Sequence, residues 1–117
     1  MSRPPPTDFA SSFATAFCSG NLQTVLDLYM PGGVLIDQSG AEHRGREAIA
    51  EIFRPLLANR ASMSIVPQTC IEYGDFAVLR NEFQIMLHNH ALIKSKSFEV
   101  LQLDGGAWKL AVDYPFG

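Results

Sequence analysis

Apolar side chains recur at helical spacing in three segments of the first half of the chain. The three stripes consist of Phe9, Phe13, Ala16 and Phe17; of Leu22, Val25, Leu26 and Tyr29; and of Ile49, Ile52, Phe53, Leu56 and Leu57. Each stripe predicts an amphipathic helix. Thr7 and Asn21 precede the first two stripes and are expected to cap those helices, and Gly20 is expected to end the first one. The second helix should stop before Pro31, and the third is expected over residues 46–58.

The rest of the chain has the pattern of β-strands. A short apolar run at residues 34–36 ends at Asp37. Longer strands are expected at residues 62–73, 76–87, 92–103 and 108–116, joined by connections at residues 74–75, 88–90 and 104–106. Three helices followed by an antiparallel meander predict an α+β domain in which the helices cover one face of a curved sheet.

The length and composition fit one domain. The chain has 117 residues, and its 47% hydrophobic content is enough for one core. Residues 1–6, with consecutive prolines at positions 4–6, are expected to form a flexible lead-in. Residues 7–117 are expected to form a single domain.

Charge and cysteine content exclude several kinds of partner and setting. The 12 acidic residues outnumber the 9 basic ones, and no run of Lys or Arg could follow a phosphate backbone, so a nucleic acid is not expected as a partner. No apolar run approaches the length of a membrane helix, and residues 1–6 lack the apolar stretch of an export signal. Cys18 and Cys70 do not make a disulfide framework, so a cytoplasmic protein is expected.

His88 and His90 are the one pair of side chains that suggests a metal site. Two histidines at this spacing on a strand would point the same way. They fall in a predicted connection, however, and no further ligand lies near them in the sequence. We therefore expect neither a metal nor a cofactor.

Four local patterns carry a resemblance to known proteins. They are residues 20–22 (Gly-Asn-Leu), residues 34–37 (Val-Leu-Ile-Asp), residues 44–49 (Arg-Gly-Arg-Glu-Ala-Ile) and residues 108–113 (Trp-Lys-Leu-Ala-Val-Asp). With the order of predicted elements, the chain resembles the SnoaL-like and ketosteroid-isomerase-like families of the NTF2-like superfamily. The resemblance implies a cone in which three N-terminal helices pack on a curved, mainly antiparallel sheet and enclose a pocket for a small hydrophobic ligand. Members of such families are isomerases, cyclases, hydratases, hydrolases or ligand binders.

The resemblance also implies three catalytic carboxyl groups. Asp37 stands where the isomerase family keeps the carboxylate that moves a proton between two carbons. Glu99 falls at the position of a second, protonated acid, and Asp113 falls where some SnoaL-like cyclases carry an acid–base residue. The hydroxyl-bearing tyrosine of the isomerase family falls on Phe13, which has no hydroxyl to donate.

The alternation of side chains along the last two predicted strands indicates which residues share a face with Glu99 and with Asp113. Glu99 shares its predicted face with Ser95, Ser97, Leu101 and Leu103, and Asp113 shares its face with Lys109 and Ala111. The predicted ligand-binding side chains are Phe13, Phe17, Phe53, Asn81 and Phe83. An apolar wall of this kind would raise the pKa of an enclosed carboxyl group.

Each polar candidate also has a structural interpretation. Asp37 could cap the turn that follows its strand, and Glu99 could pair with Lys94 or Lys96. Asp113 could bind the closing loop, and Asn81 could satisfy a bulged backbone instead of orienting a ligand. His43 could reach the pocket or lie in a solvated loop.

The face opposite Asp113 predicts an association surface. The alternation places Trp108, Leu110, Val112 and Tyr114 there, beside Phe98 and Val100 of the neighbouring strand. Such an apolar sheet face predicts a homodimer. Three functions follow from the sequence: an acid–base enzyme of the isomerase or lyase type using Asp37 with Glu99 or Asp113, a noncatalytic ligand-binding protein, or a dimeric interaction domain.

Overall fold

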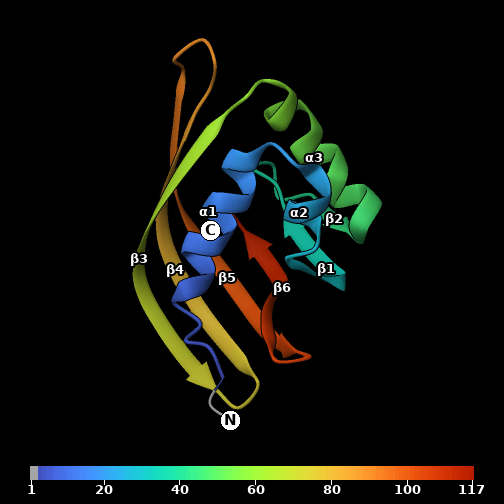
Figure 1. Ribbon diagram of the computed structural model, residues 1–117, viewed down its shortest axis with the longest axis vertical. Coiled ribbons are helices and arrows are strands. Elements are labelled where there is room, and N and C mark those ends of the chain that lie inside the picture. The colour runs from blue at the N-terminus through green and yellow to red at the C-terminus, as the bar shows by residue number, and fades with distance from the viewer. Residues whose placement is uncertain (1–2) are drawn as a thin grey trace.

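Three helices lie on one face of a curved sheet in the computed structural model, which describes residues 3–117 (Figure 1). The helices are α1 (Asp8–Ser19), α2 (Leu22–Leu26) and α3 (Arg46–Ala58). The strands are β1 (Tyr29–Ile36), β2 (Glu42–Arg44), β3 (Ser62–Tyr73), β4 (Phe76–Met86), β5 (Leu92–Asp104) and β6 (Ala107–Tyr114). Within the described range no helix is long and apolar enough to cross a membrane.

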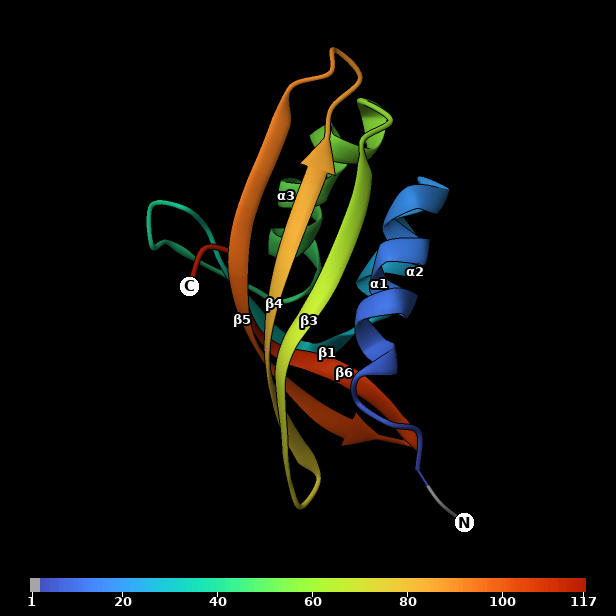
Figure 2. The same cartoon turned by 90° about the vertical axis from the view of Figure 1, so that its left-hand side faces the viewer.

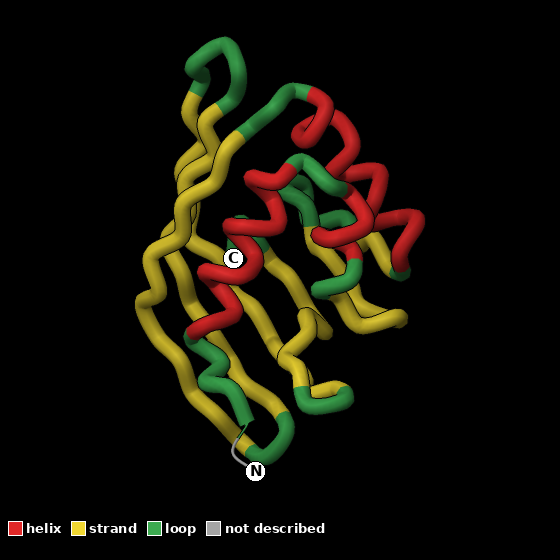
Figure 3. The backbone as a smooth tube through the Cα atoms, in the orientation of Figure 1, coloured by secondary structure: helices red, strands yellow, loops and turns green. Residues whose placement is uncertain are grey.

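The sheet has the strand order β2-β1-β6-β5-β4-β3, and only β1 and β6 pair in parallel. Figure 2 shows the long strands β3, β4 and β5 curving past the helices, and Figure 3 shows the β4–β5 connection projecting beyond the rest of the sheet. The predicted α+β class, with helices on a curved and mainly antiparallel sheet, is confirmed.

The predicted cap at Asn21, the end at Gly20 and the span of the third helix are confirmed, whereas the capping predicted for Thr7 is not. Gly20 adopts a left-handed conformation (φ 76°), and the Asn21 side chain accepts a hydrogen bond from the Thr24 amide at 3.2 Å. The Thr7 side chain makes no capping hydrogen bond, so that part of the prediction is wrong. The backbone of Thr7 is already helical (φ −62°, ψ −26°), because the turn begins at the preceding prolines: the amides of Asp8 and Phe9 donate to the Pro5 and Pro6 carbonyls.

Tyr29 begins a strand and does not extend the second helix, which corrects the helical prediction. The helix α2 ends at Leu26, and the Leu110 amide donates to the Leu28 carbonyl at 2.8 Å, which draws the chain into the sheet. The strand β1 therefore starts before the predicted run at residues 34–36, with an irregular stretch between Tyr29 and Val34. The short strand β2, which pairs with β1 through residues 42–44, was not predicted.

A bulge in β6 overturns the predicted faces of this strand. Val112 pairs with Val100, but Leu110 pairs with Leu101, so Ala111 has no partner and the alternation of side chains reverses there. Trp108 and Leu110 are consequently buried in the core and do not lie on the outer face. For the same reason Asp113 does not share a face with Lys109 and Ala111.

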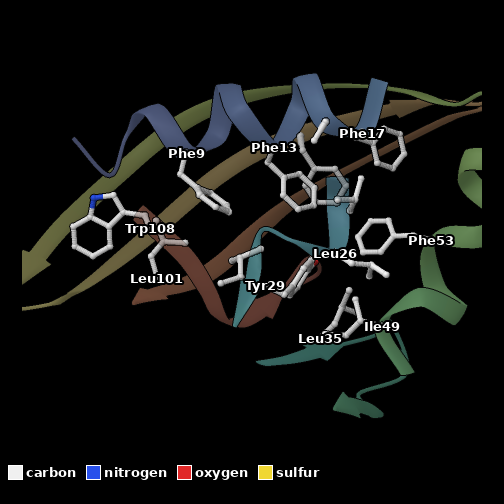
Figure 4. Packing of buried hydrophobic residues seen from close by; sticks show 14 of the residues in the cluster. Phe9, Phe13, Phe17, Leu26, Tyr29, Leu35, Ile49, Phe53, Leu101 and Trp108 are labelled. Atoms are coloured by element: carbon white, nitrogen blue, oxygen red, sulfur yellow. The ribbon is translucent and has the colours of Figure 1, made fainter. Parts of the chain in front are cut away.

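The core is built around phenylalanines of α1. Figure 4 shows Phe9, Phe13 and Phe17 pointing from α1 toward the sheet. Their spacing places them on one side of the helix. Phe13 lies 6.2 Å from the ring centre of Tyr29 and 6.1 Å from that of Phe53, in tilted or edge-on arrangements that aromatic pairs favour.

The N-terminal segment contacts the sheet around the β3–β4 turn and at the start of β6. Arg3 forms ion pairs with Glu72 and Asp75 at 3.2 and 3.3 Å, and its guanidinium lies 5.1 Å from the ring centre of Trp108. The indole of Trp108 donates to the Pro4 carbonyl at 2.7 Å. Met1 and Ser2 of the expected lead-in lie outside the described residues.

Candidate functional site

A cavity of about 130 Å³ lies between α3, the inner face of the sheet and the C-terminal residues Pro115 and Phe116. Its lining is apolar apart from four side chains, which are Asp37, Ser97, Glu99 and Asp113. The three predicted carboxyl groups therefore line one cavity. The strands β5 and β6 bring Glu99 and Asp113 there, whereas Asp37 arrives from the turn after β1.

Glu99 and Asp113 form a direct cross-strand pair, which we call the carboxyl pair. Asp113 is 5% exposed, and Glu99 is largely buried among apolar side chains. Two carboxylates opposite each other on a sheet repel, and low polarity strengthens that repulsion. The pair therefore favours a state that holds one proton.

Tyr29 binds Asp113 from the neighbouring strand. Its hydroxyl donates a hydrogen bond of 2.5 Å to Asp113 Oδ2, and the tyrosine is itself buried among aromatic rings. Burial raises the pKa of Asp113 to about 6, while the bond from Tyr29 acts in the opposite direction by stabilising the carboxylate. Burial, together with the charge of Asp113, also raises the pKa of Tyr29, so the tyrosine stays a donor.

Glu99 holds its proton more tightly than Asp113. Burial raises the pKa of Glu99 to about 8, and the negative charge of Asp113 adds to the effect. The Asn81 amide, which donates to Glu99 Oε1 at 2.9 Å, and the nearby Ser97 lower that pKa. At neutral pH these influences leave Glu99 as the neutral acid and Asp113 as the carboxylate.

Ser97 and Asn81 are a second cross-strand pair, next to the carboxyl pair. Both side chains are buried, at 2% and 1% exposure. Asn81 Oδ1 and Ser97 Oγ find no hydrogen-bond partner among residues 3–117. Ser97 is close enough to Glu99 to affect its pKa, yet its hydroxyl completes no hydrogen bond by distance and angle.

Asp37 is held by its own turn. Its Oδ1 accepts from the Ser39 amide at 2.9 Å, the Ser39 hydroxyl at 2.6 Å and the Ala41 amide at 3.0 Å, and its Oδ2 contacts His43 Nε2 at 2.8 Å. The bonds from His43 and then Ser39 lower the pKa of Asp37 well below its ordinary value. Asp37 thus combines the two interpretations of its sequence position, since it caps a turn and also lines the cavity.

The structure separates the predicted ligand-binding side chains into two groups. Phe13, Phe53 and Phe83 line the cavity, whereas Phe17 lies in the core and Asn81 lies behind Glu99. Asn81 therefore supports a carboxyl group of the site and has no contact with the cavity itself. The predicted alternative for Glu99, an ion pair with Lys94 or Lys96, is not formed, because Lys96 lies 3.9 Å from Glu82 and Glu99 faces inward.

Sequence reasoning missed two polar side chains of the candidate site. The helical spacing of the second stripe places Tyr29 in a helix, and the signal that could have placed it in a strand is the Pro-Gly-Gly sequence that follows Met30. Strand alternation places Ser97 on the face of Glu99, but nothing in the sequence distinguishes it from Ser95. In the described part of the chain, no group of three or more His, Cys, Asp or Glu side chains could hold a metal ion.

Comparison with known proteins extends these observations. A family model described as a SnoaL-like domain matches residues 10–110. Among curated proteins, none matches the chain.

Solved structures of the same fold are numerous. A ketosteroid isomerase-like protein from Erwinia carotovora atroseptica has 18% identity and a TM-score of 0.73, covering 90% of this chain and 87% of that one. An NTF2-like protein with a cystatin-like fold from Novosphingobium aromaticivorans has 18% identity and a TM-score of 0.75, covering 92% and 78%. An NTF2-like protein of unknown function from Shewanella oneidensis has 12% identity and a TM-score of 0.80, covering 94% and 98%. At these identities the likeness shows the fold.

Proposed function

Because the chain belongs to the SnoaL-like family and has its small-molecule-binding cone fold, we propose that the cavity binds a small, mainly apolar molecule and that the carboxyl pair moves a proton on it. The observation that carries this proposal is the direct pairing of Glu99 with Asp113 in an apolar cavity. General acid–base catalysis requires an acid and a base whose pKa values lie near the working pH. Burial gives both carboxyl groups such values.

Asp113 is the base and Glu99 is the acid in this proposal. The hydrogen bond from Tyr29 holds one oxygen of Asp113, so the other oxygen is the one that meets a substrate. The bond from Asn81 to Oε1 of Glu99 leaves Oε2 to carry the proton. Two carboxyl groups with separated pKa values are the arrangement that assigns acid and base in many enzymes.

An isomerisation through an enol is the reaction that this arrangement suits. Asp113 takes a proton from a carbon that lies between a carbonyl group and a C=C bond, and the electron pair of that C–H bond forms a new C=C bond to the carbonyl carbon. The carbonyl oxygen, which gains electron density, receives a hydrogen bond or the proton of Glu99. Return of a proton to the far carbon of the original C=C bond, while the carbonyl group re-forms and Glu99 and Asp113 are restored, shifts the double bond without a net change in atoms or electrons.

Asp37 is a positioning residue in this proposal. Its oxygens accept hydrogen bonds from Ser39, Ala41 and His43, and its pKa is lowered, so it is a weak base at neutral pH. Its place at the cavity follows from its turn, which fixes the end of β1.

Exchange of carbon-bound hydrogen tests the proposal. We would follow deuterium uptake at the carbons beside the carbonyl of cyclohexanone in D₂O by proton NMR. The wild type should accelerate exchange over buffer, and Asp113→Asn should lose at least about 100-fold of that acceleration, as expected for a lost acid–base group. Asp104→Asn, which changes an exposed acid at the end of β5, is the matched control and should keep it. Equal exchange by wild type and Asp113→Asn would contradict the assigned base.

We also propose that a second copy of the chain covers the outer sheet face. Ile71, Val78, Val100 and Val112 are consecutive cross-strand partners on four strands, so they form an apolar row across that face. Ile71 is 58% exposed. A row of this kind on a single chain supports a symmetric contact, which would pair the row with itself.

A further inference from the structure

Ser97 brings a hydroxyl without a partner to the wall of the cavity. Its Oγ is buried, lines the cavity and has no hydrogen-bond partner within the described residues. Buried hydroxyl groups in proteins are normally hydrogen-bonded, so an unpaired one calls for a specific explanation. Asn81, its cross-strand neighbour, does not supply the bond, because its amide nitrogen is directed to Glu99. Glu99 is close enough for Ser97 to lower its pKa, but the two side chains do not complete a hydrogen bond by distance and angle.

The surroundings of Ser97 give the cavity one polar end. Glu99 lies two positions further along the same face of β5, and Asp113 lies opposite Glu99 on β6. The wall on the other side of Ser97 is apolar, with Phe83, Ile85 and Ile93. A ligand that fills this cavity therefore meets Ser97 and the carboxyl pair on the sheet, Asp37 at the turn after β1, and hydrocarbon elsewhere.

The volume of the cavity limits the size of the ligand. It measures about 130 Å³. For comparison, an engineered apolar protein cavity of about 150 Å³ encloses a benzene molecule. The cavity therefore fits a single six-membered ring, and further fused rings would have to extend out of its open side.

We propose that the ligand is a single-ring molecule with one oxygen substituent, and that this oxygen accepts a hydrogen bond from Ser97. The inference rests on the proposed function, because it assumes that the cavity binds an apolar molecule, and it adds the size and polarity of that molecule. An accepting oxygen at Ser97 also lies beside the carboxyl pair. A ketone oxygen would then be the atom that meets Glu99, whereas a hydroxyl would in addition donate to Asp113.

Calorimetric titration with matched probes tests this inference. The oxygen-bearing probes are cyclohexanone and phenol, and their apolar counterparts are methylcyclohexane and toluene. At least one oxygen-bearing probe should bind the wild type about fivefold to tenfold more tightly than its counterpart, as expected for one hydrogen bond. Ser97→Ala should lose this preference and keep the affinity for the apolar probes. Ser95→Ala, on the same strand but outside the cavity lining, should behave as the wild type.

The outcomes separate this inference from the proposed function. A preference for cyclohexanone or for phenol that disappears in Ser97→Ala supports the inference, and the preferred probe shows whether the bound oxygen only accepts or also donates. Equal preference in wild type and Ser97→Ala overturns it while leaving the cavity as a binding site. Binding of the two-ring probe 2-naphthol without binding of any single-ring probe overturns the size limit alone. Failure of all five probes to bind would overturn both proposals.

Discussion

Glu99 and Asp113 face each other across β5 and β6, and both carboxyl groups line the same apolar cavity. At the protein surface, water would solvate two neighbouring carboxylates and weaken the repulsion between them. Inside the cavity, burial disfavours both charges and their mutual repulsion disfavours the second one most. Tyr29 is hydrogen-bonded to Asp113, and Asn81 is hydrogen-bonded to Glu99. In these surroundings the two carboxyl groups differ at neutral pH, with Glu99 protonated and Asp113 ionised.

The stability of the protein should fall as the pH rises. The pKa of Glu99 rises from 4.5 to about 8 and that of Asp113 from 3.8 to about 6 on folding. Between the unfolded and folded pKa values of each group, the folded protein holds more protons than the unfolded chain. The free energy of unfolding therefore decreases as the pH rises through this range. Glu99→Gln should remove most of this decrease. Between pH 5 and pH 8.5 the wild type should lose at least about 1.4 kcal/mol more than the variant, the equivalent of one pKa unit.

Urea denaturation at the two pH values measures this difference. Glu82→Gln is the matched control, because Glu82 is exposed on the outer face of β4. The free energy of unfolding of this variant should depend on pH as that of the wild type does. Parallel pH profiles for wild type and Glu99→Gln would show that Glu99 does not carry a raised pKa.

Tyr29→Phe should shift the protonation of Asp113. The hydroxyl of Tyr29 stabilises the carboxylate form through the bond to Oδ2, so its removal should raise the pKa of Asp113 further. It should also lower the free energy of unfolding at neutral pH by about 1–3 kcal/mol, the cost of leaving a buried acceptor unpaired. Tyr114→Phe, at the end of the same strand as Asp113 and only partly buried, should do neither. Carboxyl-selective carbon NMR and thermal denaturation would measure both effects, and an unchanged Asp113 titration would show that the hydroxyl has no influence on it.

Asp37→Ala should destabilise the protein without removing ligand binding. The lowered pKa of Asp37 means that its carboxylate stabilises the fold above its unfolded pKa and that this contribution is lost as the pH falls. At pH 7 the variant should therefore have a lower melting temperature, because the turn loses its acceptor for Ser39 and Ala41. Toluene affinity, measured by calorimetry, should stay near the wild-type value. A loss of toluene affinity with an unchanged melting temperature would contradict this prediction and would indicate that Asp37 is a catalytic or binding group.

The outer apolar row predicts the mass of the particle in solution. Multi-angle light scattering at micromolar concentration should give about twice the 12.9 kDa of one chain. Val112→Glu should shift the particle toward the monomer, since it places an unpaired charge in the apolar contact. Ser64→Glu, exposed on β3 away from the row, should leave the mass unchanged. A wild-type mass near that of one chain would contradict the proposed dimer.

Local sequence patterns predicted most of the helices and strands. The stripe of Phe9, Phe13 and Phe17 fixed both the position and the inward face of α1, because apolar residues at helical spacing can only be buried together on one side. The long strands were predicted within one or two residues, since the β3–β4 and β5–β6 turns carry glycine and aspartate at positions that favour tight connections.

The face of Asp113 could not be predicted, because it depends on a pairing between distant parts of the chain. Strict alternation from Asp113 places Leu110 and Trp108 on the opposite face, and only the unpaired Ala111 brings all of them to the inner side. Nothing local to residues 107–114 marks this bulge. Tyr29 was missed for a related reason, since its strand forms by parallel pairing with β6, a partner about 80 residues later.

The protonation state of the carboxyl pair can be measured directly. Carbon-13 NMR titration of the side-chain carboxyl carbons, assigned with Glu99→Gln and Asp113→Asn, reports each group separately. We predict that Glu99 stays protonated at pH 7 and titrates near the value of about 8, while Asp113 titrates near about 6. If both carbons complete their titration below pH 5, the pair holds no proton at neutral pH and the assignment of Glu99 as acid and Asp113 as base is wrong.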